Sequence, residues 1–258
     1  MSETQNEWDI MANKYNKVFR PRFVPVYNEI ARLVAVNNCE TVLDFATGPG
    51  EPALTILEQT ATNKVIACDG SAGMLQYLKK AIVPEGKELQ IQHLCNDKDI
   101  QHLRSDVVTC SFGIMYNSNL ANLLALFKTC APLLVCSVWA HHSTVPFLRI
   151  VKSASSGTLT DQYFETEDAS FSLWNRDKME AILKAAGYEI AEYNLVELPM
   201  EFASPKDLME FCEDSEWFTG PSKEEALARA KALMQEYFEG TSYKMNNHAY
   251  VFVAKKME

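Results

Sequence analysis

The sequence lacks an excess of positive charge and has no long run of basic residues. Lys and Arg number 24 against 34 Asp and Glu, which gives a net charge of −10. Phosphate contacts require clustered cations, so an acidic chain of this kind is a poor candidate for binding nucleic acid. The composition favours a small-molecule partner instead.

The sequence also lacks cysteine pairs at metal or redox spacing. Its seven cysteines are scattered and none forms a C-x-x-C pair, which argues against a zinc or thioredoxin-like site. Most lie in apolar stretches, as expected of reduced, buried thiols in a cytoplasmic protein. The polar N-terminus predicts no signal peptide, and no stretch approaches the ~18 apolar residues of a membrane span.

Short apolar segments alternate with helical patterns along most of the 258 residues. Such alternation predicts an α/β fold with a mainly parallel sheet. The expected strands are 41–46, 64–68, 89–94, 106–111, 133–139, 188–195 and 248–254. The expected helices are 8–19, 22–36, 51–60, 71–82, 120–129 and 175–186.

The region after residue 150 departs from this alternation. Residues 153–168 are polar and are expected to form a loop. Cap signals at Ser204-Pro205 and at Ser222, with Glu225 three residues later, predict two helices within about 204–239. We therefore expect a single domain. Its parts are an N-terminal helical lid (1–38), a core (39–200), a helical cap insertion (201–246) and the last strand (247–258).

A glycine-containing turn follows the first expected strand. Residues 48–53 satisfy G-x-G-x-x-A, the dinucleotide fingerprint, but the same turn also suits a site for S-adenosylmethionine. Asp69, at the end of the second strand, suits ribose hydroxyls in both interpretations. Asp44 favours the second, because a carboxylate inside a strand is costly to bury and dinucleotide sites usually carry an apolar residue there.

Five motifs in order resemble the class I S-adenosylmethionine-dependent methyltransferase family. Residues 44–50 resemble its (D/E)-x-G-x-G-x-G motif, with Ala46 in place of the first glycine. Residues 69–75 resemble the D-x-S-x-x-M-L signature of the ubiquinone/menaquinone-biosynthesis-like (methyltransferase type 11) branch. Later motifs match at Asn96-Asp97, 106–112 and 186–188. The resemblance spans about 8–195 and 247–254.

This resemblance implies a Rossmann-like, seven-stranded, mostly parallel sheet with an antiparallel last strand, N-terminal helices and a helical cap insertion. It implies S-adenosylmethionine as cofactor, with Asp44 and the glycine turn at the methionine end, Asp69 at the ribose and Asp97 at the adenine amino group. Gly70 or Met74 would flank the adenine. The expected cofactor-binding residues are Tyr15, Asp44, Ala46, Thr47, Gly48, Gly50, Asp69, Gly70, Met74, Asn96, Asp97 and Ser111.

Acceptor and catalytic residues are expected on the segments that leave the carboxyl ends of the strands. His141 and His142 follow the fifth strand and are candidate general bases. No carboxylate stands at ligand spacing from this pair, so no metal site is predicted. Tyr116 and Trp217 are expected to contact a small, partly apolar acceptor, methylated on O, C or N.

Two other functions fit parts of the sequence. A nicotinamide-dependent oxidoreductase would use the G-x-G-x-x-A turn, although the Tyr-x-x-x-Lys pair of the short-chain type is missing in a fitting context. A non-catalytic module would bind S-adenosylmethionine without turnover. The oligomeric state is left open.

Overall fold

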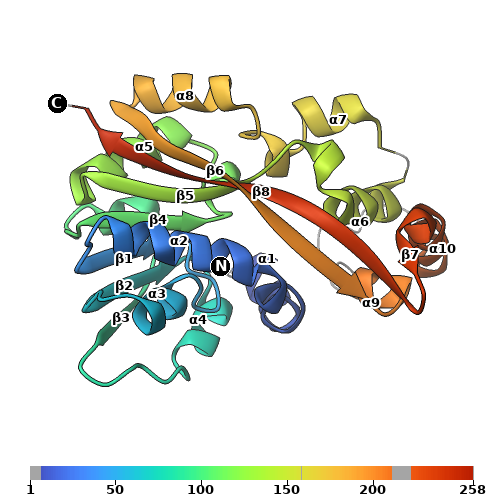
Figure 1. The fold of residues 1–258 in the computed structure, drawn as a ribbon, viewed down its shortest axis with the longest axis horizontal. Coiled ribbons are helices and arrows are strands. Elements are labelled where there is room, and N and C mark those ends of the chain that lie inside the picture. Colours follow the sequence, from blue (N-terminus) through green and yellow to red (C-terminus); the bar gives the residue numbers. More distant parts are fainter. Residues whose placement is uncertain (1–6, 158, 211–221, 258) are drawn as a thin grey trace, which may run out of the picture.

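The computed structural model describes residues 7–157, 159–210 and 222–257. These residues form an eight-stranded sheet in the order β3-β2-β1-β4-β5-β8-β6, with β7 paired to β8 (Figure 1). The strands are β1 (Thr41–Phe45), β2 (Lys64–Asp69), β3 (Glu88–His93), β4 (Val107–Ser111), β5 (Leu133–Trp139), β6 (Tyr188–Phe202), β7 (Phe238–Glu239) and β8 (Ser242–Lys256).

The sheet combines a parallel part with an antiparallel last strand. Strands β1 to β5 pair in parallel, whereas β8 lies antiparallel between β5 and β6. The predicted α/β fold is therefore confirmed, and the strand beyond the expected seven is the two-residue β7.

Helices cover both faces of the sheet. Figure 1 shows α2, α3 and α4 on one side and α5 and α8 on the other. The helices are α1 (Glu7–Lys14), α2 (Val24–Val36), α3 (Ala53–Gln59), α4 (Ala72–Leu78), α5 (Leu120–Cys130), α6 (Pro146–Ser156), α7 (Asp161–Thr166), α8 (Arg176–Ala185), α9 (Pro205–Met209) and α10 (Lys223–Met234). Short helical turns are η1 (Tyr15–Phe19), η2 (Arg20–Phe23), η3 (Asp97–Ile100), η4 (Ile114–Tyr116), η5 (His142–Thr144), η6 (Ala169–Phe171) and η7 (Gln235–Tyr237).

Strands β6 and β8 are both longer than predicted. Pairing with β5 uses only Ala249–Lys255 of β8, while pairing with β6 continues to Tyr243. The two strands thus form a ribbon that projects beyond the parallel sheet and carries α9, β7 and α10 (Figure 1). Leu198, Met200 and Phe202 are buried at every second position, with the exposed Pro199 and Glu201 between them, which is the period of a strand.

The polar loop predicted at 153–168 is wrong. Helix α6 continues to Ser156, and α7 occupies much of the remainder. Ala154 and Ser155 are buried, and α6 packs against α10, so tertiary contact supports a helix that composition alone does not favour. Thr160 caps α7 by accepting a hydrogen bond from the Tyr163 N–H.

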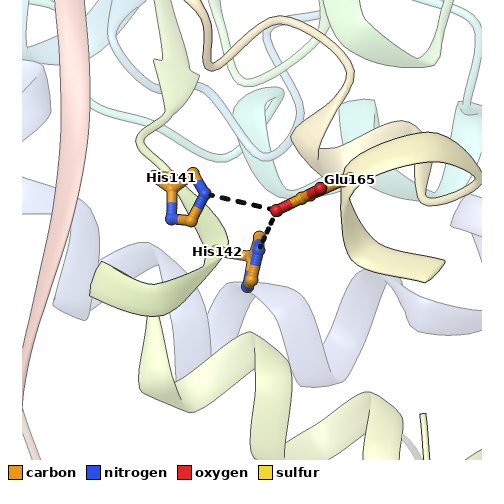
Figure 2. A group of neighbouring side chains, drawn as sticks. All are labelled: His141, His142 and Glu165. Atoms are coloured by element: carbon orange, nitrogen blue, oxygen red, sulfur yellow. Dashed lines mark ion pairs between the residues drawn. The ribbon is translucent and has the colours of Figure 1, made fainter. Parts of the chain in front are cut away.

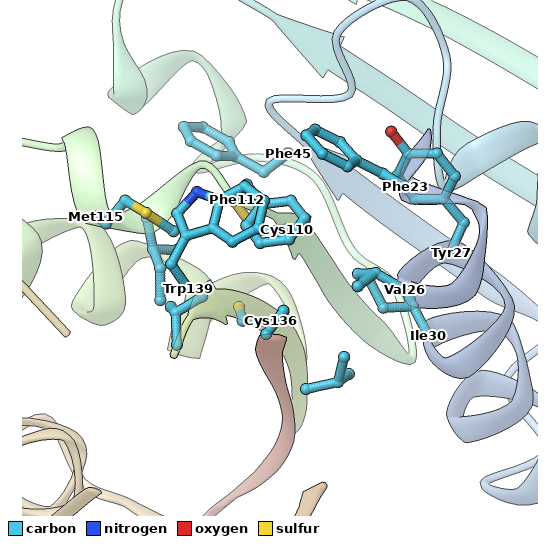
Figure 3. Close-up of a cluster of buried hydrophobic side chains, with 14 of the residues drawn as sticks. Phe23, Val26, Tyr27, Ile30, Phe45, Cys110, Phe112, Met115, Cys136 and Trp139 are labelled. Atoms are coloured by element: carbon cyan, nitrogen blue, oxygen red, sulfur yellow. The ribbon is translucent and has the colours of Figure 1, made fainter. Parts of the chain in front are cut away.

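An aromatic cluster lies where α2 and the preceding turn meet the sheet (Figure 3). Phe112 and Trp139 stack with ring centroids 4.2 Å apart. Phe23 contacts both rings, at 5.2 and 5.5 Å. Phe112 follows β4 and Trp139 ends β5. The hydrophobic core therefore extends to the carboxyl ends of these strands, where it consists of aromatic side chains.

The cysteines behave as predicted over the described residues, with one exception. Those at 39, 68, 110, 130 and 136 are free and buried, whereas Cys95 is free and exposed. Cys212 lies outside the described residues. In the described part of the chain, every helix is too short or too polar to cross a bilayer.

Asn247 joins the last strand to the segment that follows β5. It is fully buried, and its Oδ1 accepts a hydrogen bond from the Phe147 N–H at 3.0 Å. Its Nδ2 donates to the carbonyls of Leu198 and Met245 at 3.4 and 3.3 Å. This side chain therefore fixes the start of α6 against β8.

We expect Asn247→Ala to lower the free energy of unfolding by about 2 to 3 kcal/mol, because it leaves a buried N–H without its acceptor. Urea denaturation measures the change. Asn246→Ala is the matched control, since this neighbour is exposed and bonds only to the exposed Glu197. Equal losses in the two variants would show that Asn247 is not a structural anchor.

Candidate active site

A cavity opens at the carboxyl ends of β1, β2, β4 and β5. Its volume is about 230 Å³. Its walls come from the N-terminal segment, the turns after these strands and the start of α6. The lining residues are Trp8, Tyr15, Phe19, Phe23, Ala46, Gly48, Asp69, Gly70, Ser71, Met74, Ser111, Phe112, Gly113, Tyr116, Trp139, Phe147 and Leu148.

The turn after β1 requires glycine at two positions. Gly48 has φ +57° and Gly50 has φ +114°, both in the left-handed region. A Cβ at Gly50 would also lie 2.6 Å from Leu78 Cδ1. Ala46 adopts φ +57° as well, which is costly for a residue with a Cβ and is typical of strained functional turns.

Asp69 connects this turn to the start of α4. Its Oδ2 accepts a hydrogen bond from the Gly48 N–H at 2.7 Å, and its Oδ1 accepts one from the Ser71 N–H at 2.8 Å. Burial raises the pKa of the Asp69 carboxyl above its usual value. Each carboxylate oxygen can accept a further hydrogen bond, so Asp69 can still bind hydroxyl groups in the cavity.

Asp44 lies behind the turn and does not line the cavity. It is fully buried in β1, and its Oδ1 accepts a hydrogen bond from Thr109 Oγ1 at 2.6 Å. Its Oδ2 has no hydrogen-bond partner among the described residues. Burial raises the pKa of this carboxyl to about 7.

The N-terminal segment covers the cavity and is held there by Asp9. The Asp9 Oδ1 accepts hydrogen bonds from Ser71 Oγ at 2.5 Å and from the Gly73 N–H at 2.7 Å. Glycine suits position 73, since a Cβ there would lie 3.0 Å from Asp9. This contact brings Trp8 and Tyr15 over the site.

Tyr116 is fixed by a buried polar network. Its hydroxyl lies 3.0 Å from Ser170 Oγ, which accepts a hydrogen bond from Lys152 Nζ at 2.9 Å. Lys152 also forms an ion pair with the buried Asp168. Trp8 meets the Tyr116 ring edge-on at 5.9 Å, so the lid and the network hold this ring from two sides.

The structure brings eight of the predicted site residues to the cavity. They are Tyr15, Ala46, Gly48, Asp69, Gly70, Met74, Ser111 and Tyr116. Thr47 and Gly50 shape the turn without lining the cavity, and the Gly50 N–H donates to the Thr47 carbonyl at 3.0 Å.

The other predicted residues lie elsewhere. Asn96 caps η3, and Asp97 Oδ2 accepts a hydrogen bond from Asn117 Nδ2 at 2.8 Å. Neither lines the cavity, and neither do His141 and His142, which face α7. Trp217 lies outside the described residues.

Most of the apolar wall was not predicted as site residues. Phe112 and Trp139 stand where β4 and β5 end, and the rule that ligands bind at the carboxyl ends of strands would have identified them. Phe147 and Leu148 belong to α6, and Phe19 and Phe23 to the N-terminal turns. No local pattern in the sequence places those residues at the cavity.

Comparison with known proteins identifies the core of the chain. Residues 42–135 match the family model described as Methyltransferase domain. No curated protein sequence matches the chain.

Solved structures share the fold at low sequence identity. A chain in the complex of the Haloferax volcanii Trm112 methyltransferase activator with a methyltransferase has a TM-score of 0.62 and 15% identity, covering 99% of this chain and 100% of that one. A methyltransferase of Bacillus halodurans has a TM-score of 0.59 and 15% identity, covering 90% and 99%. The magnesium protoporphyrin IX methyltransferase of Synechocystis, solved with bound SAH, has a TM-score of 0.56 and 12% identity, covering 93% and 86%.

Residues 42–135 match a methyltransferase domain, in agreement with the predicted class I S-adenosylmethionine-dependent methyltransferase and its cofactor, and the solved structures show that the chain shares the fold. The predicted ubiquinone/menaquinone-like branch stays a prediction. The antiparallel β8 between β5 and β6 differs from the 3-2-1-4-5-6 order of dinucleotide-binding folds. The oxidoreductase alternative is therefore disfavoured by the sheet itself.

Asp44→Asn tests whether the buried Asp44 carboxyl keeps its proton in the folded state. With a pKa of about 7 in the fold against 3.8 in the unfolded chain, the folded state keeps a proton that the unfolded state releases. The contribution of Asp44 to stability is thus complete below pH 3.8 and is lost as the pH rises through 7. We expect wild type to lose roughly 4 kcal/mol relative to Asp44→Asn over this interval.

Urea denaturation of both proteins from pH 4 to 8 measures this difference, and other titrating groups cancel in the comparison. A stability difference that does not change with pH would show that Asp44 is not held protonated.

Proposed function

We propose that this chain transfers the methyl group of S-adenosylmethionine to a small, partly apolar acceptor, with donor and acceptor in the same cavity. The observation that carries the proposal is the composition of that cavity. Gly48, Asp69 and Ser71 form one polar side, while the remaining wall is dominated by aromatic rings. Such a site suits a polar nucleoside beside an apolar acceptor.

The polar side supports the following arrangement of the cofactor. Asp69 accepts hydrogen bonds from the ribose hydroxyls, and Gly70 and Met74 flank the adenine. Gly48 lets the backbone approach the methionine part, and Asp44 supports that turn from behind. Asp97 does not line the cavity, so its contact with the adenine amino group stays a prediction.

The aromatic wall supports the arrangement of the acceptor. Methyl transfer from a sulfonium is an in-line displacement, for which orientation in a closed site supplies up to ~7–11 kcal/mol in favourable cases. Phe112, Trp139 and Phe147 line the cavity with aromatic rings, which suit an apolar acceptor. Tyr116, held by Ser170, offers the hydroxyl that orients the acceptor.

Among the described residues no histidine lines the cavity. We therefore assign catalysis mainly to positioning, and His141 and His142 stay a prediction as general bases. The cap residue Trp217 likewise stays a prediction as an acceptor contact. The negative net charge supports a small molecule over a nucleic acid.

Asp69→Asn tests the cofactor arrangement. Loss of the charge weakens hydrogen bonds to the ribose, so we expect S-adenosylhomocysteine to bind about tenfold more weakly. Isothermal titration calorimetry measures the change. Asp106→Asn is the matched control, because Asp106 also accepts from two backbone N–H groups, those of Glu40 and Thr41, but at the opposite edge of the sheet.

Equal affinity in Asp69→Asn and wild type would remove Asp69 from the cofactor site. A similar loss of affinity in Asp106→Asn would mean that these substitutions weaken binding by disturbing the fold and not by removing a contact with the cofactor.

An S-adenosylhomocysteine-release assay tests the acceptor class. We expect turnover with members of a panel of small phenols, aromatic amines and apolar carboxylic acids. Tyr116→Phe should lower kcat/KM for the accepted compound about tenfold while leaving S-adenosylhomocysteine affinity unchanged, since the hydroxyl orients the acceptor only. Turnover with nucleic acid or protein substrates and none with small molecules would overturn the proposal.

A further inference from the structure

Two consecutive histidines and a glutamate from a separate helix meet on the far side of the cavity wall. His141 and His142 belong to the segment that leaves β5, and Glu165 belongs to α7. Figure 2 shows both imidazole rings directed at the same Glu165 carboxylate. The fold thus supplies the carboxylate that the sequence lacks at ligand spacing.

The distances bring one possible ligand atom of each residue together. His142 Nε2 lies 3.6 Å and His141 Nε2 lies 3.9 Å from Glu165 Oε1. All three ligand atoms lie within 4.8 Å of one another. In a tetrahedral zinc shell with bonds of about 2.0–2.1 Å, ligand atoms are roughly 3.4 Å apart, so the shell closes when these separations shrink by a few tenths of an ångström to at most about 1.4 Å.

The burial of His142 is the observation that a purely structural role does not explain. Its side chain is 2% exposed, and neither ring nitrogen has a hydrogen-bond partner among the described residues. The ring stacks on Phe164 and lies 4.1 Å from the ring of His141. Buried imidazole nitrogens without hydrogen bonds are costly, and a bound ion is one way in which proteins offset that cost.

We propose that His141, His142 and Glu165 bind a divalent transition-metal ion, with Zn²⁺ as the best match. Two imidazoles and one carboxylate are a ligand set that zinc uses when one position is left for water. His141 and Glu165 have side chains that are 30% and 50% exposed, so an ion can enter from solvent.

The surroundings orient both rings for this role. Ser143 Oγ lies 2.7 Å from His141 Nδ1 and can accept a hydrogen bond from the Nδ1–H, which leaves Nε2 free for the metal. Metal binding selects this tautomer over the one in which His141 Nδ1 accepts from the Ser143 N–H at 3.3 Å. Asp161 Oδ1 lies 3.9 Å from His142 Nδ1, the ring nitrogen that the metal does not use.

The nearby cation does not prevent metal binding. Arg149 donates a hydrogen bond to Asp161 Oδ1 at 2.8 Å, so its charge is offset by that carboxylate. A bound ion would join α7 to the segment between β5 and α6. Trp139 precedes His141 by two residues and Phe147 follows in α6, and both line the cavity. The metal therefore supports the acceptor wall from outside and does not depend on the proposed acceptor.

The direct test is titration of the full chain, purified without an affinity tag and freed of metal by chelation, with Zn²⁺ against a chromophoric chelator. We expect one high-affinity equivalent per chain. Glu165→Gln and His141→Ala should each weaken Zn²⁺ binding about 100-fold, because each removes a ligand. Both residues are partly exposed, so the variants should fold, which circular dichroism checks.

Glu167→Gln is the matched control, an exposed glutamate two residues from Glu165 that is not in the cluster. It should bind Zn²⁺ as wild type does. Co²⁺ should give the visible absorption of a four-coordinate site in wild type and lose it in Glu165→Gln. Binding that stays weak and non-stoichiometric, or that is the same in Glu165→Gln and wild type, would overturn the metal site without bearing on methyl transfer.

Discussion

The active site depends on one half-buried carboxylate. Asp69 bonds to the N–H groups of Gly48 and Ser71, and in doing so it joins the turn after β1 to the first residues before α4. These two segments are distant in the chain but adjacent in the sheet, because β1 and β2 pair in parallel. A single side chain thus sets the distance between the two walls that the cofactor must contact.

The N-terminal segment that covers the site is held by the same contacts around Ser71. Ser71 caps α4 with its hydroxyl oxygen and donates that hydroxyl to Asp9 in α1. The lid is therefore docked on the residue that Asp69 positions. Trp8 and Tyr15 reach the cavity as a consequence, and Phe112 and Trp139 line the same cavity. Sheet, turn and lid form a connected set of contacts around one space.

The sequence predicts those parts of the site that local geometry dictates. Gly48, Gly50 and Asp69 stand in motifs that can be recognised from the sequence alone. In the structure Gly48 and Asp69 line the cavity, and Gly50 shapes the turn without lining it. Phe147 and Leu148 are not predictable in this way, because the register of β8 and the side chain of Asn247 decide where α6 begins. The meeting of Glu165 with the two histidines likewise depends on packing between separate elements.

The central claim is that this cavity holds S-adenosylmethionine, and ligand-dependent thermal melting of the unmodified protein tests it most directly. S-adenosylhomocysteine at about 100 times its dissociation constant should stabilise the fold by roughly 2.7 kcal/mol. For a chain of this length the melting temperature then rises by about 5–10 °C. NAD and NADP should give no shift. A shift with either nicotinamide cofactor, and none with S-adenosylhomocysteine, would contradict the account.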